Sequence, residues 1–158
     1  MPLKTGDKLP AFKGATAEGP ISAKDLKGSN VVLYFYPRDD TPGCTIEACA
    51  FRDNLPKFKK MNAKVYGISK DDLASHGKFT EKYELPFTLI SDEDGSICEA
   101  FGTWVEKANY GKKYMGIERA TYLADETGTI RQIWRNVKAA GHAEEVLEAV
   151  KEIKKSAA

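Results

Sequence analysis

The sequence lacks several features that would assign it to whole classes of protein. No apolar run approaches the roughly 20 residues that a membrane-spanning helix needs. The first residues contain no apolar segment of the kind found in signal peptides, so we expect no signal peptide. The chain has only three cysteines, which cannot all pair within one chain and so argue against a secreted scaffold held by disulfides. We therefore expect a cytoplasmic protein that does not bind membranes.

A charge excess of either sign is also missing. The formal net charge is +1, from 24 basic and 23 acidic side chains that are interspersed along the chain. Such a mixture offers no basic patch for nucleic acid. With 158 residues, 42% of them hydrophobic and 30% charged, the composition is that of an ordinary globular domain. Because no repeat, low-complexity tract or linker interrupts the chain, we expect residues 1–158 to form a single domain.

Common catalytic and metal-binding motifs are missing as well. The chain has no Cys-x-x-Cys pair, no glycine-rich phosphate loop and no serine nucleophile elbow. Its two histidines, His76 and His142, have no cysteine or carboxylate cluster at metal-ligand spacing, so we expect surface or capping positions for them. Cys44 and Cys49 lack the second pair that a structural zinc site would need. The sequence therefore predicts no metal site.

What the chain does contain is a pair of cysteines at a junction between a strand and a helix. The continuous apolar run at residues 31–36 predicts a buried strand. A turn with two prolines and a glycine follows, and Cys44 then falls in the first turn of a helical pattern. Unpaired backbone N–H groups and the positive end of the helix dipole favour a thiolate there, and the thiolate is the nucleophilic form. Cys49, five residues on, is available to react with whatever Cys44 becomes. We interpret the two as a redox-active pair.

The residues around Cys44 also carry a family resemblance. Together they resemble the active-site signature of the peroxiredoxins: Pro37, Thr41, Pro42, Gly43, Cys44, Thr45 and Glu47. The second cysteine, Cys49, is similar to that of the Q subfamily, the bacterioferritin comigratory protein type. Residues 110–119, Tyr-Gly-Lys-Lys-Tyr-Met-Gly-Ile-Glu-Arg, resemble the segment that precedes the arginine-bearing strand in that subfamily. The resemblance covers nearly the whole chain.

The resemblance implies catalytic roles for four residues. Cys44 would be the attacking, or peroxidatic, thiol and Cys49 the resolving thiol. Thr41 would bring its hydroxyl over the thiolate, although a threonine that only stabilises the turn is the alternative. Arg119 would stabilise the thiolate and the developing charge, because a guanidinium keeps its proton at every working pH. From spacing alone other arginines would be equal candidates: Arg38, Arg52, Arg131 and Arg135.

Four further residues are expected to shape the substrate pocket. Pro37 and Pro42 would form the loop and shield the sulfur from water. Gly43 would let the backbone approach the substrate, although a simple turn role would also explain it. Glu47 matches the signature, but an acid in the first helical turn is favourable in any helix. The third cysteine, Cys98, lies on an apolar stripe and is expected to be a buried bystander.

The function implied is that of a thiol-dependent peroxidase with antioxidant activity. Cys44 would reduce hydrogen peroxide or an organic hydroperoxide and become a sulfenic acid. Cys49 would condense with it to an intrachain Cys44–Cys49 disulfide, which a thioredoxin-like dithiol protein would reduce. No cofactor is implied: neither metal, haem nor flavin. The Q subfamily is often monomeric, so we expect a monomer.

Two other functions remain open at this stage. A thioredoxin-fold disulfide oxidoreductase would normally carry Cys-x-x-Cys and a proline before a late strand, and residues 117–120 contain no proline. A redox sensor or holdase, oxidised by peroxide without catalytic turnover, is compatible with the same residues. A steady-state assay with thioredoxin and its reductase separates it from a peroxidase, because a sensor turns over once.

The order of elements predicts an α/β protein. We expect the following: a small hairpin from residues 11–12 and 15–17, a short helix at 21–27 capped by Ser22, strands at 30–36, 64–68, 86–91, 120–124 and 129–134, helices at 45–61, 72–83, 96–101 and 143–155, and a loop at 102–116. Pro56 should kink or break the helix expected at 45–61. The pattern indicates a mixed β-sheet sandwiched by helices. The resemblance implies a thioredoxin-like fold with an N-terminal extension hairpin.

Overall fold

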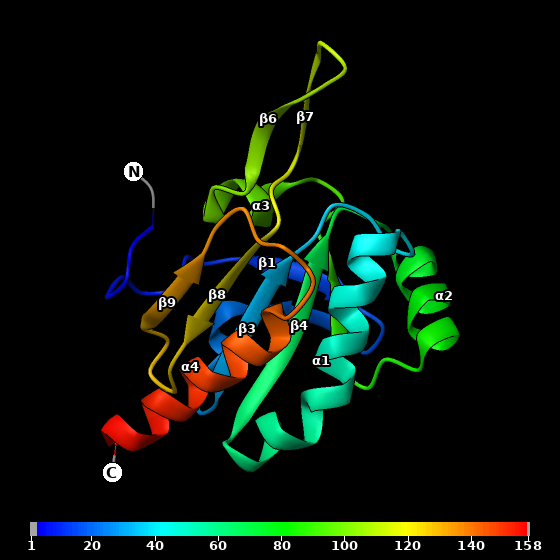
Figure 1. Ribbon diagram of the computed structural model, residues 1–158. Coiled ribbons are helices and arrows are strands. Elements are labelled where there is room, and N and C mark those ends of the chain that lie inside the picture. Colours follow the sequence, from blue (N-terminus) through cyan, green and yellow to red (C-terminus); the bar gives the residue numbers. More distant parts are fainter. Residues whose placement is uncertain (1–2, 158) are drawn as a thin grey trace.

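The computed structural model describes residues 3–157, and within that range the side chains outside positions 109 and 154–157. Figure 1 shows a twisted sheet with helices packed on it. In chain order the elements are β1 (Lys13–Thr16), β2 (Gly19–Ser22), the 3₁₀ helix η1 (Ala23–Leu26), β3 (Asn30–Phe35), α1 (Pro42–Lys60), β4 (Ala63–Ser69), α2 (Leu73–Tyr83), β5 (Thr88–Ser91), α3 (Ser96–Phe101), β6 (Trp104–Asn109), β7 (Lys112–Ile117), β8 (Ala120–Ala124), β9 (Ile130–Trp134) and α4 (His142–Ala157).

Within residues 3–157 seven strands form one mixed sheet, in the order β2-β1-β5-β4-β3-β8-β9. The central strands β3, β4 and β5 are parallel, and α1 and α2 supply the crossovers between them. The other neighbours pair antiparallel, including the β1–β2 hairpin. The expected mixed sheet and N-terminal hairpin are confirmed, but the arms of the hairpin lie further along the chain, with the turn at residues 17–18.

The central strand β3 divides the core into two layers. Its six residues are all buried, and alternate side chains point to opposite faces of the sheet. Val32 and Tyr34 pack in the core beneath α1, α2 and α4. Val31, Leu33 and Phe35 pack in the second core with α3 and the N-terminal segment. Burial of both faces explains why this strand is a continuous apolar run in the sequence.

Helix α1 begins earlier than the sequence suggested and extends past Pro56. It starts at Pro42, because proline lacks only an N–H that the first helical position would leave unpaired. It also continues through Pro56 as one helix, so of the predicted kink or break the break is wrong. Pro56 is exposed, whereas Phe51, Leu55 and Phe58 around it are buried in the core. The packing of these side chains outweighs the one backbone hydrogen bond that proline removes.

The predicted loop at 102–116 is wrong, because this segment forms the β6–β7 hairpin. The hairpin projects from the body of the molecule (Figure 1) and is paired from Trp104↔Ile117 to Asn109↔Lys112. Its two-residue turn, Tyr110 and Gly111, has φ values of 51° and 78°. Positive φ at both positions matches the twist of a hairpin, but it normally comes with Asn-Gly or Asp-Gly. Tyrosine at the first position is unusual for this turn, so the sequence did not predict it.

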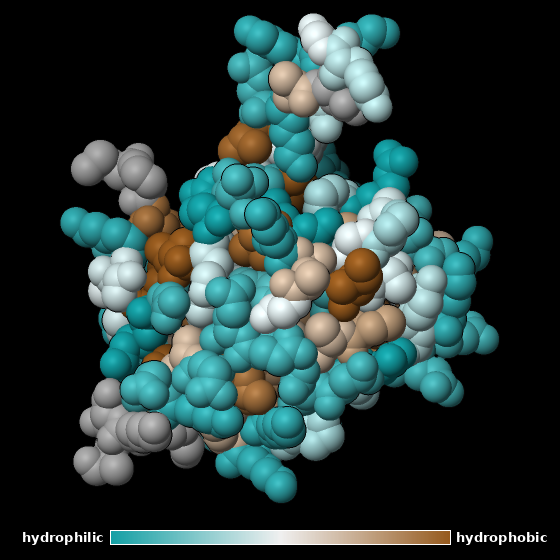
Figure 2. All heavy atoms as spheres, in the orientation of Figure 1, coloured by the Kyte–Doolittle hydropathy of each residue, from teal (hydrophilic) through white to brown (hydrophobic). Residues whose placement is uncertain are grey.

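The remaining boundaries agree with expectation to within about one helical turn. The apolar spacing in α2 predicts that Leu73 faces inward with Phe79 and Tyr83, but Leu73 is 41% exposed at the start of the helix. Figure 2 shows a mostly hydrophilic face with scattered apolar side chains. None of the helices in the described part of the chain is long and apolar enough to cross a membrane.

Candidate active site

The N-terminus of α1 places Cys44 against the end of β3. Thr41 is the N-cap residue with an extended backbone, and its carbonyl accepts the first helical hydrogen bond, from Thr45 N at 2.8 Å. The amides of Gly43 and Cys44 come before that bond, so helix geometry leaves them without a carbonyl partner. Cys44 is buried, with 1% of its surface exposed. Cys44 therefore lies in the first helical turn, where these two amides have no helical carbonyl partner, in a site that excludes most water.

Arg119 reaches this sulfur from a distant part of the sequence. It precedes β8, which pairs with β3 in the register Phe35↔Ala120, so the pairing brings residue 119 to the end of β3. Its Nη2 lies 3.4 Å from Cys44 Sγ. Three of the other arginines pair with carboxylates elsewhere: Arg52 with Asp53, Arg131 with Asp125, and Arg135 with Glu118. Sheet register thus selects among arginines that spacing left equivalent.

Glu47 forms the other half of the Arg119 contact. Its Oε1 accepts a hydrogen bond from Arg119 Nη1 at 2.8 Å, and the side chain is fully buried. Burial raises the pKa of Glu47 to about 7, although Arg119 works in the opposite direction. Its Oε2 is buried and has no hydrogen-bond partner within the described part of the chain. Burial lowers the pKa of Arg119, but Glu47 and Cys44 outweigh it and the net pKa is raised, which keeps the guanidinium charged.

Thr41 and Gly43 line the same corner of the site. The Thr41 hydroxyl donates to the carbonyl of Arg38 at 2.9 Å, and no hydrogen bond to Cys44 is found for it among residues 3–157. Its proton is thereby committed, while its lone pairs stay free to accept a hydrogen bond. A Cβ added to Gly43 would lie 3.0 Å from Arg119 Nη2. Glycine therefore leaves room for the guanidinium to approach the backbone without displacement.

Pro37, Pro42 and Cys49 are placed around this centre. Both prolines are exposed, with Pro37 in the turn after β3 and Pro42 at the first position of α1. Cys49 lies on α1, half-buried, and is a free thiol like Cys44. The structure thus brings Cys44, Glu47 and Arg119 into direct contact, with Thr41 and Gly43 beside them. It keeps Cys49 on the same intact helix, one turn and a half further on.

Cys98 lies apart from these residues. It is buried in the core layer with α3, as expected of a bystander. Burial, together with the nearby Asp92 carboxylate, raises the pKa of its thiol. The third cysteine is therefore held in the protonated form.

Both histidines are buried, so the expected surface positions are wrong. His76 lies on the inner face of α2 with Asp39 and Ile90 as partners. His142 faces Thr121 Oγ1 at 2.7 Å, and burial lowers its pKa. A usable signal was present for His76, since a helix with Phe79 and Tyr83 inward places residue 76 on the same face.

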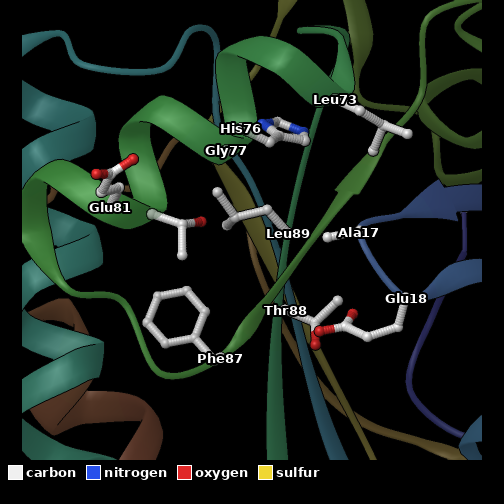
Figure 3. A pocket seen from close by; sticks show the side chains of 10 residues that line it. Ala17, Glu18, Leu73, His76, Gly77, Glu81, Phe87, Thr88 and Leu89 are labelled. Carbon is white, nitrogen blue, oxygen red and sulfur yellow. The ribbon is translucent and has the colours of Figure 1, made fainter.

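A cleft beneath α2 is separate from the cysteine site. Figure 3 shows it between α2, β5 and the turn that joins β1 to β2, with Leu89 and Phe87 along the cleft and Glu18 at its edge. None of the candidate catalytic residues lines it. His76 does, which places that side chain between the cleft and the loop that leads to Cys44.

Comparison with known proteins gives consistent matches along the chain. The model of the AhpC/TSA family matches residues 5–133. The chain is similar to a putative peroxiredoxin Bcp of Coxiella burnetii, with 52% identity over 93% of this chain and 98% of the relative. It is also similar to peroxiredoxin Bcp of Bacillus subtilis, with 45% identity over 97% of this chain and 98% of that protein.

A solved structure extends the likeness to the fold. The chain resembles the bacterioferritin comigratory protein of Xanthomonas campestris, whose trapped intermediate/ligand complex structures concern its alkyl peroxide reduction activity. The identity is 40%, the TM-score is 0.89, and the match covers 96% of this chain and 99% of that one. The thioredoxin-like arrangement implied by the sequence is thereby confirmed.

Proposed function

This chain belongs to the AhpC/TSA family and is a thiol-dependent peroxidase of the peroxiredoxin type, and on that premise we propose that Cys44 is its attacking thiolate. The sulfur attacks one oxygen of the peroxide, the O–O bond breaks, and the other oxygen leaves as an alkoxide or hydroxide that takes up a proton. Sulfur is oxidised by two electrons to a sulfenic acid while the peroxide is reduced. The observation that carries this assignment is the 3.4 Å contact between Cys44 Sγ and Arg119 Nη2.

The neighbouring groups support the same step. Arg119 and the amides of Gly43 and Cys44 offer donors where negative charge sits on sulfur and then develops on the leaving oxygen. The Thr41 hydroxyl donates its proton to the Arg38 carbonyl, so its oxygen can accept a hydrogen bond from the O–H group of the peroxide. Glu47 holds the second arm of the guanidinium, which fixes its orientation. Pro37 and Pro42 shape the loop that carries these groups.

Cys49 is the proposed resolving thiol. It attacks the sulfenic sulfur of Cys44, water leaves, and an intrachain disulfide forms. In a regular helix, residues five apart have Cα atoms roughly 8.7 Å apart. Disulfides need Cα atoms closer than about 7 Å. Because both cysteines lie on the continuous helix α1, its first turns must unwind before the two sulfurs can meet.

The cycle closes with an external dithiol. We propose a thioredoxin-like reductant, which would reach the disulfide once the unwound segment exposes it. Both hydrogen peroxide and organic hydroperoxides are proposed substrates, and the protein is proposed to act as a cytoplasmic monomer formed by one domain of residues 1–158. The Xanthomonas campestris relative, with its alkyl peroxide reduction activity, supports the organic substrates.

Mass spectrometry after one equivalent of peroxide tests this scheme. The expected product is a Cys44–Cys49 disulfide, with Cys98 left as a thiol. In Cys49→Ser the protein should react once and stop at a sulfenic acid on Cys44 that dimedone traps. A linkage through Cys98, or unaltered thioredoxin-linked turnover in Cys49→Ser, would remove Cys49 from the resolving role. Sustained turnover of the parent with thioredoxin and its reductase excludes a sensor that is oxidised only once.

A further inference from the structure

Asp39, in the loop that leads to Cys44, is the centre of a buried hydrogen-bond cluster. Its Oδ1 accepts from Tyr36 Oη at 2.6 Å, and its Oδ2 accepts from Ser75 Oγ at 2.8 Å. His76 Nδ1 lies 2.7 Å from the same Oδ2. Burial raises the pKa of Tyr36, so its hydroxyl keeps the proton that it donates. The carboxylate of this loop residue is therefore held from two elements, the end of β3 and helix α2.

The His76 ring is fixed at both nitrogens. Its Nε2 lies 3.1 Å from the carbonyl oxygen of Ile90, and a carbonyl can only accept, so Nε2 carries a proton. On the other side of the ring, Nδ1 lies 2.7 Å from Asp39 Oδ2, within hydrogen-bond distance. The ring thus links the loop to β5 through the inner face of α2. Ligand atoms of Asp39, Asp71 and His76 lie within 4.8 Å of one another, but these hydrogen bonds already engage them without a metal ion.

A second tie joins the same loop to the far end of α2. The neighbouring residue Asp40 accepts from Lys82 Nζ and Tyr83 Oη, each at 2.9 Å. This pair is exposed, whereas Asp39 and His76 are almost completely buried. An exposed ion pair contributes little, because water competes for it. Of the two ties, the buried one dominates.

Helix α2 buries few of its side chains. Across its described length, His76 and Phe79 are its buried residues. The cleft beneath it separates part of the helix from β5 (Figure 3). Losing the His76–Asp39 contact would therefore loosen both the helix and the loop.

We propose that Asp39 and His76 are positioning residues that hold residues 37–44 in the folded, peroxide-reactive arrangement. By doing so they set how readily the start of α1 unwinds toward the disulfide. This inference rests on the proposed function, because the unwinding is needed for a Cys44–Cys49 disulfide. The tie favours the peroxide step, which needs the loop in place, and slows the disulfide step, which needs the loop released.

Two matched substitutions test the tie. In His76→Asn the amide nitrogen can occupy the place of Nδ1 and keep the bond to Asp39, whereas His76→Gln reaches toward Ile90 and loses Asp39. In single-turnover reactions with hydrogen peroxide, His76→Gln should form the disulfide about tenfold faster, as expected for losing a hydrogen bond to a charged group. Its peroxide step should slow by no more than about twofold, because most molecules stay folded. His76→Asn should restore both rate constants toward the parent.

Lys82→Ala is the control, since it removes only the exposed tie and should leave both rates nearly unchanged. Amide exchange of residues 38–44 in the thiol form gives a second reading that needs no peroxide, and it should accelerate in His76→Gln but not in His76→Asn. Equal behaviour of the two variants in both readings overturns the proposal. A parent that links other cysteines would instead overturn the resolving role of Cys49, and amide exchange would still judge the tie.

Discussion

Cys44 and Cys98 occupy the same position in two different helices. Each is the third residue of a helix that follows a strand of the parallel centre of the sheet, α1 after β3 and α3 after β5. Both are almost completely buried. Helix position and burial therefore do not distinguish them.

The two cysteines differ in the charged group that lies next to each sulfur. At Cys44 the guanidinium of Arg119 lies 3.4 Å from the sulfur, and helix geometry leaves the amides of Gly43 and Cys44 without a carbonyl partner. At Cys98 the Asp92 carboxylate accepts hydrogen bonds from the amides of Ile97 and Cys98 at 3.0 and 2.8 Å. Asp92 uses the donors of the helix end and also repels a thiolate. At Cys98 the helix N-terminus is thus already occupied by a carboxylate and cannot stabilise a thiolate.

Replacing each cysteine by serine should give the largest difference between the two regions. Cys44→Ser should lower peroxide consumption by about 10³-fold or more, because the proposed nucleophile is lost. Cys98→Ser should keep the parental rate and lose about 1–3 kcal/mol of unfolding free energy from burying a hydroxyl. Steady-state peroxide assays and chemical denaturation measure the two effects. A parental rate in Cys44→Ser would place the reactive sulfur elsewhere.

Arg119→Lys tests whether the facing charge alone is enough. Lysine keeps the charge but cannot contact Glu47 and Cys44 with two separate nitrogens, so the peroxide step should slow on the order of 10²-fold. Arg135→Lys is the control, because Arg135 pairs with Glu118 at the surface and should leave the rate unchanged. Stopped-flow measurement of the peroxide-step rate constant tests this prediction. An equal loss of rate in both variants would show a general effect of arginine removal.

Glu47 sharpens the comparison, since it is an acid close to Cys44 as Asp92 is close to Cys98. Its pKa is raised from 4.5 to about 7, so the folded protein binds a proton that the unfolded chain has released between these values. The stabilisation is complete below pH 4.5 and is lost as the pH rises through 7. Relative to Glu47→Gln, the parent should lose about 3 kcal/mol of unfolding free energy across this window. Denaturation at several pH values measures the difference, and parallel curves for the two proteins would contradict it.

Gly43→Ala should give the smallest effect. The new Cβ would lie 3.0 Å from Arg119 Nη2, so the guanidinium must move by a few tenths of an ångström. We expect the peroxide step to slow by about 2–5-fold. Gly77→Ala is the matched control on α2, because an added Cβ would point into open space beside the helix; it should keep the rate and add about 0.5–1 kcal/mol of stability. An unchanged rate in Gly43→Ala would mean that Arg119 tolerates the displacement.

Local patterns predicted much of the fold, and they failed where neighbours in space mattered. The strand at β3 and the helix at α4 were readable because burial imposes a period on their own residues. The continuation of α1 past Pro56 could not be predicted from the local sequence, because it depends on the core in which Phe51 and Phe58 pack. The β6–β7 hairpin was missed because its turn uses Tyr110 at a positive φ, against the usual preference.

The site divides in the same way. Cys44, its place in the first turn of a helix, and the resemblance of its surroundings to the peroxiredoxin signature could all be found in the sequence, because they lie within a dozen consecutive residues. The contacts of Arg119 with Cys44 and Glu47 span more than 70 positions and exist because β8 pairs with β3. The link between Asp39 and His76 spans 37 positions, and α2 must fold back over the sheet to form it. The side chains that can do the chemistry follow from the amino-acid sequence alone. The charge that each of them faces follows from the folded arrangement, because electrostatic interactions depend on distances in space.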